Sequence, residues 1–375
     1  MKLKRLLLIL AVLPLLLNGC GGKEDHVEIP GPPEPVQTEE PGTEDPGTED
    51  PGTDPGTNPG QTNPWDANRG KIVTPSGSQW TSATVREGII YYHFSGKDEL
   101  SGQMEEIFAV DVDLNNSKYE VKLTRLASSA VTSTVHKNNN SIATINAGYE
   151  QGSIYIRSGG IDYSIIPNVQ IGDTGQDNWK SEGAFWINSS GKPGIVFAGS
   201  PKRDGVITGI KGVSYADAVK KQRSYYMNDL KKANYPYLIS SAPSLIDDFN
   251  PIGENFCDYN ITTTQVNNLN SENLERHQRV LHPRTAIALT ENNHLILIVV
   301  DGRQTNRKGF SARQLTKFLV KWFNPQYALN LDGGGSTAMC VEGQGDSRNI
   351  VNSPIQDGEP GKERARDTHI VVLAK

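Results

Sequence analysis

Short runs of alternating or continuous apolar residues recur along the chain from about residue 106 onward. Glycine and asparagine separate these runs, which is the pattern of β-strands joined by turns. The strands that this pattern predicts cover residues 106–112, 119–126, 141–146, 153–156, 184–187, 194–197, 284–289, 295–301 and 327–332.

Two segments show the helical period instead. Residues 215–233 and 311–323 both place apolar side chains at helical spacing among polar ones. Ser311 stands at the N-cap position of the second segment, with Gln314 three residues later, which is the spacing of a capping box. Many strands and few helices predict an α+β fold, in which a strand-rich mixed sheet has few flanking helices.

The order of elements near the C-terminus brings several charged residues together. A turn centred on residue 292 folds the strands around it into an antiparallel hairpin and places Arg284 beside residue 300, at the same end as Asp301. The strand, helix and strand over about 295–332 form a βαβ unit, whose crossover makes its outer strands parallel. Asp301 and Asp332 should therefore lie at one edge of the sheet, where ligands of α/β sheets bind.

A glycine-rich loop follows Asp332 directly. It reads Gly333, Gly334, Gly335, Ser336 and Thr337. Three glycines permit a sharp turn and a close approach of backbone to ligand, and successive N–H groups can form an anion nest. A tight turn without a ligand is the alternative for the glycines taken alone. No lysine follows them, which excludes a Walker loop, and the nucleophile-elbow pattern of serine hydrolases is also absent.

The first twenty residues combine a basic start with an apolar run that ends at Cys20. This is the layout of a secretory signal peptide, and the run is too short to span a bilayer stably. Gly19-Cys20 resembles a bacterial lipobox, in which the cysteine is diacylated; a plain signal peptide with a chance cysteine is the alternative. Because acidic residues follow closely, we expect an extracytoplasmic protein that Cys20 anchors by lipid to the outer membrane, exposed at the cell surface.

Residues 21–64 contain repeats of Pro-Gly-Thr with acidic residues and almost no apolar side chain, which predicts a disordered stalk. Eleven acidic residues against Lys23 give this stalk a net charge of −10, and the signal peptide carries +3. Since the whole chain carries −6, the residues from 65 onward sum to +1, which argues against a nucleic-acid partner. We expect a strand-rich N-terminal part or lead-in at 65–140 and the core at 141–375.

Two cysteines remain, Cys257 and Cys340. They could form a disulfide in an oxidising compartment or remain two separate buried thiols, and the sequence leaves both open. No cluster of cysteine and histidine has the spacing of a zinc site, so no metal site is predicted. The sequence does not indicate an oligomeric state.

Several stretches between about residues 141 and 373 resemble the phosphodiester glycosidase family. The most specific is LNLDGGGSTAM at 329–339; the others are 145–149, 242–248, 282–287, 300–303, 351–354 and 363–364. Glu150 stands where the family usually has phenylalanine, and residues 366–369 depart from the family's usual pattern.

The resemblance implies a hydrolase that acts at an anomeric carbon bonded to a phosphodiester oxygen, with a sugar-phosphate or glycan substrate such as an exopolysaccharide. Arg284 or Arg303 would offset the charge of the departing phosphate. Asp301 or Asp332 would attack the anomeric carbon or activate water. The remaining candidates for binding substrate are Asn146, Gly333, Gly334, Gly335, Ser336, Thr337 and Asn352. No cofactor is required in this scheme, although it is compatible with a divalent cation.

Two other functions fit the same residues. A surface glycan-binding lipoprotein could keep the fold without catalysis, and the departure at Glu150 leaves room for it. A metal-assisted phosphodiesterase would instead cleave the P–O bond, with a divalent ion held by the aspartates and Asn330. Purely structural roles are also open, since Arg284 could form a salt bridge with Asp301.

Overall fold

The computed structural model describes residues 71–164, 180, 182–197, 235–253, 262–269 and 273–375. The predicted signal peptide with Cys20, the stalk at 21–64, the helix at 215–233 and Cys257 lie outside the described residues. In the part that is described, no helix has both the length and the apolar character needed to cross a membrane.

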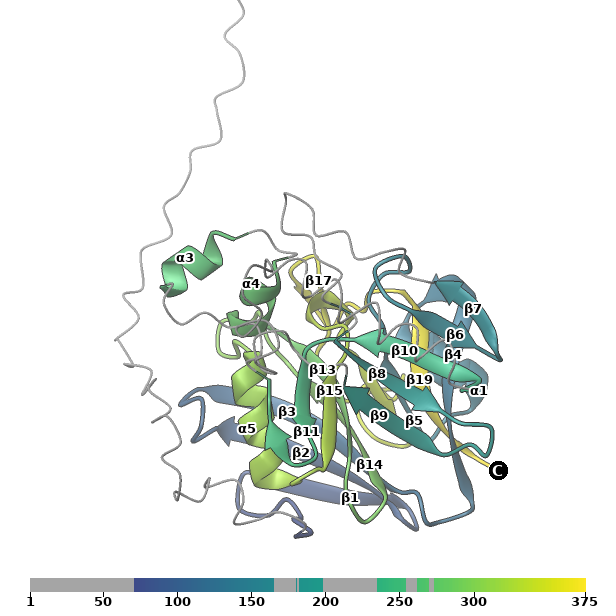
Figure 1. The fold of residues 1–375 in the computed structure, drawn as a ribbon. Helices are drawn as coiled ribbons and strands as arrows, with labels where there is room; N and C mark the ends of the chain where they lie inside the picture. Colours follow the sequence, from purple (N-terminus) through teal and green to yellow (C-terminus); the bar gives the residue numbers. More distant parts are fainter. Residues whose placement is uncertain (1–70, 165–179, 181, 198–234, 254–261, 270–272) are drawn as a thin grey trace, which may run out of the picture. The chain divides into compact units, whose positions relative to one another are not determined.

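Eight antiparallel strands form the central sheet (Figure 1). Across the sheet they are β1 (Trp80–Arg86), β2 (Ile89–Lys97), β3 (Met104–Asp113), β14 (His294–Val300), β13 (Arg284–Leu289), β15 (Tyr327–Asn330), β11 (Ser244–Asp247) and β12 (Asn250–Pro251). Successive side chains of a strand point to opposite faces. In β14 both sets are buried, because Leu295, Leu297 and Val299 belong to one core and their neighbours to another. The apolar run of β14 therefore reflects a sheet that is covered on both faces.

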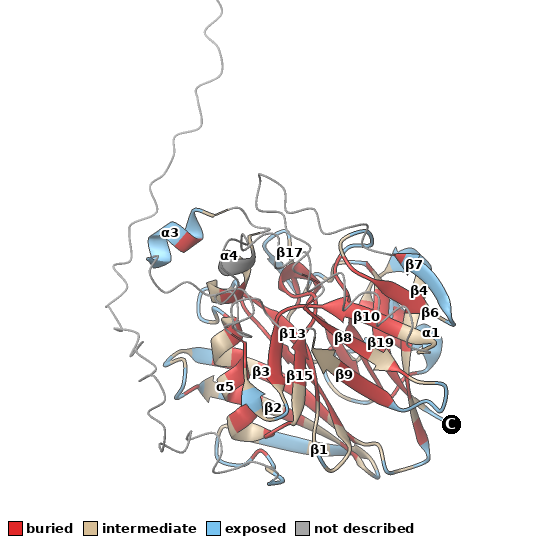
Figure 2. Ribbon diagram, viewed as in Figure 1, coloured by how far each residue is buried: buried red, intermediate tan, exposed pale blue. Residues whose placement is uncertain are grey.

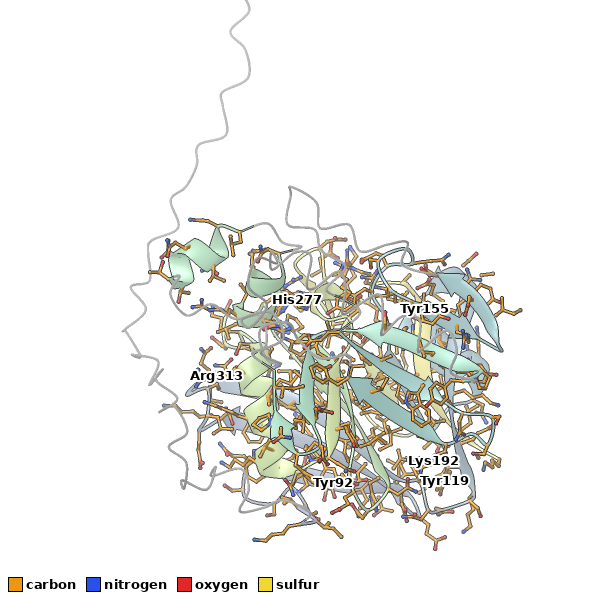
Figure 3. The ribbon with its side chains drawn as sticks, viewed as in Figure 1. Tyr92, Tyr119, Tyr155, Lys192, His277 and Arg313 are labelled. Carbon is orange, nitrogen blue, oxygen red and sulfur yellow. The ribbon has the colours of Figure 1, made fainter. Side chains whose placement is uncertain are left out.

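Two smaller antiparallel sheets share a core with one face of the central sheet (Figures 1 and 2). The first consists of β7 (Ile161–Ser164), β6 (Ile156–Ser158), β10 (Tyr237–Ser241), β8 (Gly183–Ile187) and β9 (Pro193–Phe197). The second consists of β16 (Met339–Val341), β5 (Ala143–Asn146), β19 (Arg366–Ala374) and β4 (Tyr119–Ala130). Their side chains fill the space between the sheets (Figure 3). The predicted α+β, strand-rich fold with few helices is confirmed.

Helix α5 (Ala312–Trp322) covers the other face of the central sheet. Leu315, Phe318 and Leu319 pack into that core. The Ser311 side chain accepts a hydrogen bond from the Gln314 amide, and the Gln314 side chain accepts one from the Ser311 amide. The predicted capping box is therefore present.

The predicted hairpin and βαβ unit are both present. Arg284 is paired with Val300 in the ladder between β13 and β14. Both β14 and β15 run antiparallel to β13, which lies between them, so β14 and β15 are parallel to each other and α5 makes the crossover. Asp301 and Asp332 consequently follow the carboxyl ends of two parallel strands, as the order of elements predicted.

The residues before 141 join the same sheets as those after it. Strand β3 pairs with β14 along its length, and β4 pairs with β19. The short elements are the helices α1 (Thr132–Asn139), α3 (Thr263–Asn267) and α4 (Leu274–Arg279), the 3₁₀ turn η3 (Gly334–Ser336), and the hairpin of β17 (Ile355–Gln356) and β18 (Glu359–Pro360). Cys340 in β16 is buried as a free thiol.

A buried carboxyl group, that of Glu105, lies at the end of β3 that is nearest Asp301. The Glu105 side chain is 1% exposed, and its neighbours include Asp98, Asp301 and the backbone N–H of Gly309. Burial, with a smaller contribution from the neighbouring aspartates, raises the pKa of Glu105 to about 8. The group is therefore protonated in the folded state at neutral pH and ionised in the unfolded state.

We predict that Glu105→Gln increases stability at pH 7, because the wild-type fold must take up a proton there. A raised pKa makes the contribution of Glu105 to stability greatest below its unfolded pKa of about 4.5, and that contribution is lost as the pH rises toward 8. The gain should be roughly 1–3 kcal/mol at pH 7 and close to zero near pH 4.5. Urea unfolding at both pH values measures it; an equal effect at both would contradict the assignment.

Candidate active site

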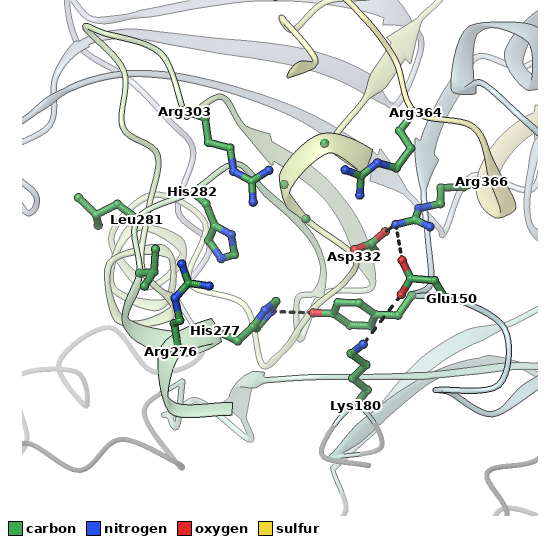
Figure 4. Close-up of a pocket in the computed structure, with 15 residues that line it drawn as sticks. Glu150, Lys180, Arg276, His277, Leu281, His282, Arg303, Asp332, Arg364 and Arg366 are labelled. Carbon is green, nitrogen blue, oxygen red and sulfur yellow. Dashed lines mark hydrogen bonds and ion pairs between the residues drawn. The ribbon is translucent and has the colours of Figure 1, made fainter. Parts of the chain in front are cut away.

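A pocket of about 270 Å³ opens beside the glycine-rich loop, where β15 ends (Figure 4). Asp332 and Gly333–Gly335 form one side of it, and α4 with the segment that follows forms another. Its volume is slightly below the range of about 300–1,000 Å³ that is typical of small-molecule sites. Its lining is rich in charge, with five cationic side chains, namely Lys180, Arg276, Arg303, Arg364 and Arg366.

Asp332 is bound by Arg366, the first residue of β19. The guanidinium Nη2 lies 2.6 Å from Oδ2 of Asp332 and 3.0 Å from Oε1 of Glu150. Lys180 Nζ is 3.9 Å from the other oxygen of Glu150. Two carboxylates and two cations thus form a chain of ion pairs along one wall (Figure 4), and this wall is electrically balanced.

Burial raises the pKa of Asp332 to about 6, although Arg366 and a hydrogen bond with Ser336 act in the opposite direction. Ser336 also accepts a hydrogen bond from Nε of Arg366, at 2.6 Å. The carboxyl group of Asp332 therefore changes its charge close to neutral pH, which is the range in which a catalytic acid or base is useful.

Asn146, the last residue of β5, holds the backbone behind Asp332. Its amide nitrogen donates to the Asp332 carbonyl at 2.6 Å, and its amide oxygen accepts from Thr285 Oγ1 and from the Ala338 N–H. These bonds join β5, β13 and both sides of the glycine-rich loop. The side chains of Asn146 and Thr285 are both fully buried. The network therefore fixes where Asp332 can lie.

The three glycines admit neighbouring groups that a side chain would exclude. A Cβ atom at Gly333 would lie 2.6 Å from the carbonyl oxygen of Pro283, and Gly334 donates its N–H to the same oxygen. A Cβ at Gly334 would lie 2.9 Å from the Arg303 guanidinium, and one at Gly335 would lie 2.6 Å from that of Arg364. The loop therefore lets two arginines approach the backbone closely.

Three further arginines line the pocket outside this chain of ion pairs. Arg276, Arg303 and Arg364 have no carboxylate within ion-pair distance among the described residues. The pKa of Arg303 is lowered by burial and by the charges of Arg364 and Arg276. Arg303 also has a left-handed backbone, with φ of 57°, which is an unusual and strained conformation for arginine.

Two histidines also line the pocket. Burial and the nearby arginines lower the pKa of both His277 and His282 well below the usual range, so both are neutral at physiological pH. Nε2 of His277 is 2.8 Å from the hydroxyl of Tyr149, and that hydroxyl also bonds with the Ala242 carbonyl. Nε2 of His282 is buried in the pocket lining and has no hydrogen-bond partner in the described part of the chain.

The structure divides the residues that the sequence singled out. Asp332, Arg303 and the three glycines line the pocket. Six lie outside its lining: Asn146, Arg284, Asp301, Ser336, Thr337 and Asn352.

Asp301 supports the loop at 351–353 instead of facing the pocket. Its carboxylate accepts hydrogen bonds from Asn352 Nδ2 at 3.0 Å and from the Ser353 N–H at 3.0 and 3.1 Å. Asn352 in turn donates to the Thr337 carbonyl and accepts from the Met339 N–H. Burial raises the pKa of Asp301 to about 6. This cluster fixes the far side of the glycine-rich loop.

Arg284 is fully buried, and its guanidinium serves main-chain carbonyls. Nε donates to Phe310, and Nη2 donates to His277 and more weakly to Val280 and Gln278. A cation at the C-terminal end of α4 satisfies carbonyls that the helix leaves unbonded. Arg284 thus positions the segment that carries His277, and the cations that line the pocket come from other residues.

Sequence reasoning did not single out Tyr149, Lys180, Arg276, His277 or Arg366 as site residues. Arg366 belongs to the stretch at 366–369 that departs from the family's usual pattern, and Glu150 is the departure at 145–150. The two departures contact each other through the ion pair. For Arg366, this pair of departures at distant positions was the signal that could have found it.

No group of three or more His, Cys, Asp or Glu side chains in the described residues is arranged to hold a metal ion. Arg366 binds Asp332 directly and Arg364 lies near it, and these cations disfavour a divalent ion at that carboxylate. Cations and neutral donors are suited to an anion, and a phosphoryl group is the biological anion that such a site commonly binds.

A family model described as phosphodiester glycosidase matches residues 132–373, more than half of the chain. The chain belongs to the phosphodiester glycosidase family. None of the curated proteins compared with it gives a significant match.

Three solved structures are similar to this phosphodiester glycosidase family member. The zebrafish N-acetylglucosamine-1-phosphodiester alpha-N-acetylglucosaminidase catalytic domain, auto-inhibited by its pro-peptide, shares 20% identity with a TM-score of 0.48, covering 81% of this chain and 87% of that one. A hypothetical protein from Synechocystis shares 13%, with a TM-score of 0.44 and coverage of 80% and 64%. A putative exported protein from Burkholderia pseudomallei shares 10%, with a TM-score of 0.45 and coverage of 80% and 98%.

We predict that Gly333→Ala displaces the glycine-rich loop, because the added methyl group meets the Pro283 backbone oxygen. Overpacking against backbone typically costs about 1–3 kcal/mol of folding stability, and the shift of Asp332 should also reduce ligand binding. Gly335→Ala is the matched control, since its methyl group meets only the flexible ends of Gln356 and Arg364. Thermal unfolding of both variants tests this; equal stability losses would show that the Pro283 contact is unimportant.

Proposed function

We propose that this protein hydrolyses a sugar-1-phosphodiester at the bond between the anomeric carbon and the phosphate oxygen, within glycan or exopolysaccharide material. The observation that carries the proposal is one pocket that holds both a carboxyl group with a pKa of about 6, Asp332, and three arginines that pair with no carboxylate among the described residues. A glycosidase needs the carboxylate for the sugar, and a phosphate leaving group needs the cations. The family membership supports this reaction class.

Arg276, Arg303 and Arg364 are assigned to the phosphoryl group. Guanidinium groups bind phosphate oxygens with two parallel hydrogen bonds, and three of them stabilise the negative charge that develops as the C–O bond breaks. The electron pair of that bond stays on the phosphate oxygen, and the product is a phosphomonoester. Because phosphate is a good leaving group when so neutralised, the scheme requires no separate general acid.

Asp332 is assigned to the anomeric carbon. In its ionised form the carboxylate either attacks that carbon or takes a proton from the water that does, so the water oxygen ends on the sugar and its proton is released. Arg366 and Ser336 hold the ionised form in place, which keeps it available near neutral pH. The N–H groups of Gly333 and Gly335, for which the described chain provides no acceptor, are donors for substrate oxygens.

We predict that Asp332→Asn folds but loses most turnover, by about 10²–10⁴-fold, because asparagine keeps the size of the side chain and loses its charge. Asp301→Asn is the matched control. It sits at the same edge of the sheet but outside the pocket lining, so its activity should fall less and its stability should fall more. Mass spectrometry of a set of sugar-1-phosphodiesters, incubated with each variant, measures release of free reducing sugar and phosphomonoester.

The pH dependence gives an internal check on the same variant. An ionised Asp332 predicts that kcat/KM falls as the pH drops below about 6, the pKa of this carboxyl group. Residual activity of Asp332→Asn should lack that acidic limb. If Asp332→Asn is folded and fully active, or keeps the limb, the assignment of Asp332 is wrong.

The alternatives give different outcomes in the same assay. A glycan-binding protein without catalysis would bind sugar-1-phosphodiesters and release no product. A metal-assisted phosphodiesterase would lose its activity with EDTA, whereas the proposed reaction is unaffected because arginines provide the positive charge. No cofactor is part of the proposed mechanism.

The proposed location is outside the cytoplasm, with Cys20 acylated and the segment 21–64 acting as a spacer between the membrane and the folded part. This rests on the sequence alone. The spacer would let the pocket reach glycan material beyond the membrane surface.

We predict that Cys20→Ser produces soluble protein without attached lipid, because the thiol is the acylation site. Fractionation of cells and labelling with a radioactive fatty acid measure the change against the wild-type chain. Unchanged membrane association and labelling would rule out the lipoprotein assignment.

A further inference from the structure

The charged side chains of the pocket fall into two groups that differ in net charge. Lys180 and Arg366 are paired with Glu150 and Asp332, so the four charges of this group cancel while both carboxyl groups are ionised. Arg276, Arg303 and Arg364 contribute three further positive charges, and none has a carboxylate within ion-pair distance among the described residues. Burial lowers the pKa of Arg303, and repulsion from the like charges of Arg364 and Arg276 lowers it further. An anion of matching charge would relieve the repulsion.

The glycine-rich loop lets two of these three arginines approach its backbone closely. The absence of side chains at Gly334 and Gly335 allows the guanidiniums of Arg303 and Arg364 to pack against the loop backbone. His282, which is 9% exposed, lines the same pocket, and its buried Nε2 has no partner among the described residues. A buried polar atom without a partner is costly unless a ligand bonds to it. Two independent features therefore point to a bound group with several oxygens.

The proposed reaction changes the charge of its ligand. A phosphodiester carries one negative charge, whereas a phosphomonoester carries two once its second proton is lost, with a pKa of about 6. We infer that Arg276, Arg303, Arg364 and His282 form a subsite for a dianionic phosphoryl group, so that the phosphomonoester product binds more tightly than the diester substrate and inhibits the enzyme. Inhibition by product rests on the proposed function, whereas the preference for a dianion does not.

Methyl phosphate and dimethyl phosphate test this preference without any sugar. They differ by one methyl group and, near pH 7.5, by one negative charge. An additional charge facing three guanidiniums should make methyl phosphate bind at least about 10-fold more tightly, by isothermal titration at low ionic strength in a buffer free of phosphate and sulfate. Equal affinities would overturn the inference.

The comparison at about pH 5 separates the charge of the ligand from the charge of the protein. Methyl phosphate is then a monoanion, so the preference should fall below about 3-fold. Asp332 also becomes neutral in this range, while Glu150, with a lowered pKa, stays ionised and Lys180, Arg366 and the three arginines stay charged. Burial and the nearby arginines lower the pKa of His277 and His282 well below the usual range, which opposes protonation of either imidazole at the lower pH. Loss of the Asp332 charge strengthens binding of both anions equally, and dimethyl phosphate reports that effect alone.

Arg303→Gln removes one charge of the subsite and should reduce the affinity for methyl phosphate by about 10-fold near pH 7.5, with a smaller effect on dimethyl phosphate. Arg86→Gln is the control for a lost surface charge, because Arg86 pairs with Glu342 and neither residue lines the pocket. An unchanged preference in Arg303→Gln would overturn the inference. If the preference is present and no diester is hydrolysed, the proposed function is wrong and the subsite is supported. If diester is hydrolysed and the preference is absent, the proposed function is supported and the subsite is wrong.

Discussion

The geometry of the pocket depends on the buried ion pair between Asp332 and Arg366. The carboxylate ends the path of β15 in the central sheet, and the guanidinium begins β19 in the four-stranded sheet. The pair can form only when both sheets pack in the correct register. A buried carboxylate that lost its cation would carry a large desolvation cost, so packing and charge placement are linked here. Arg366 also reaches Glu150, and through it Lys180, so one residue organises a whole wall.

The residues around this pair divide into those that face the ligand space and those that hold the loop. Asn146 fixes the backbone of Asp332, Asp301 fixes residues 352 and 353, and Arg284 fixes the end of α4. None of the three lines the pocket, yet each is buried and strongly hydrogen-bonded. Buried polar networks of this kind hold the backbone in a precise position, which a reacting group requires.

The sequence predicted the backbone geometry of the site better than the directions of its side chains. The turn at residue 292 set the register that places Arg284 beside Val300, and the crossover through α5 made β14 and β15 parallel. Both inferences needed only local periodicity and the rules of chain connection. Whether Asp301 faces the pocket or the loop at 352–353 depends on contacts with residues fifty positions away, which no local pattern encodes.

The cations of the pocket were harder to predict for the same reason. Lys180, Arg276 and Arg366 come from three regions of the chain that share no motif. An isolated charged residue in a sequence cannot be distinguished from a solvent-exposed surface residue. The glycines were recognised as permitting close backbone approach, but the groups that approach most closely in the structure are the Arg303 and Arg364 side chains. That contact becomes visible only when the loop and both arginines are seen in one place.

The central claim is that the bond broken is the one between the anomeric carbon and the phosphate oxygen. Hydrolysis of a sugar-1-phosphodiester in water enriched in oxygen-18 tests it directly, with mass spectrometry of both products. We predict that the heavy oxygen appears at the anomeric hydroxyl of the released sugar and that the phosphomonoester stays unlabelled. Label in the phosphomonoester would mean that the P–O bond is cleaved, and would contradict the roles assigned to Asp332 and to the three arginines.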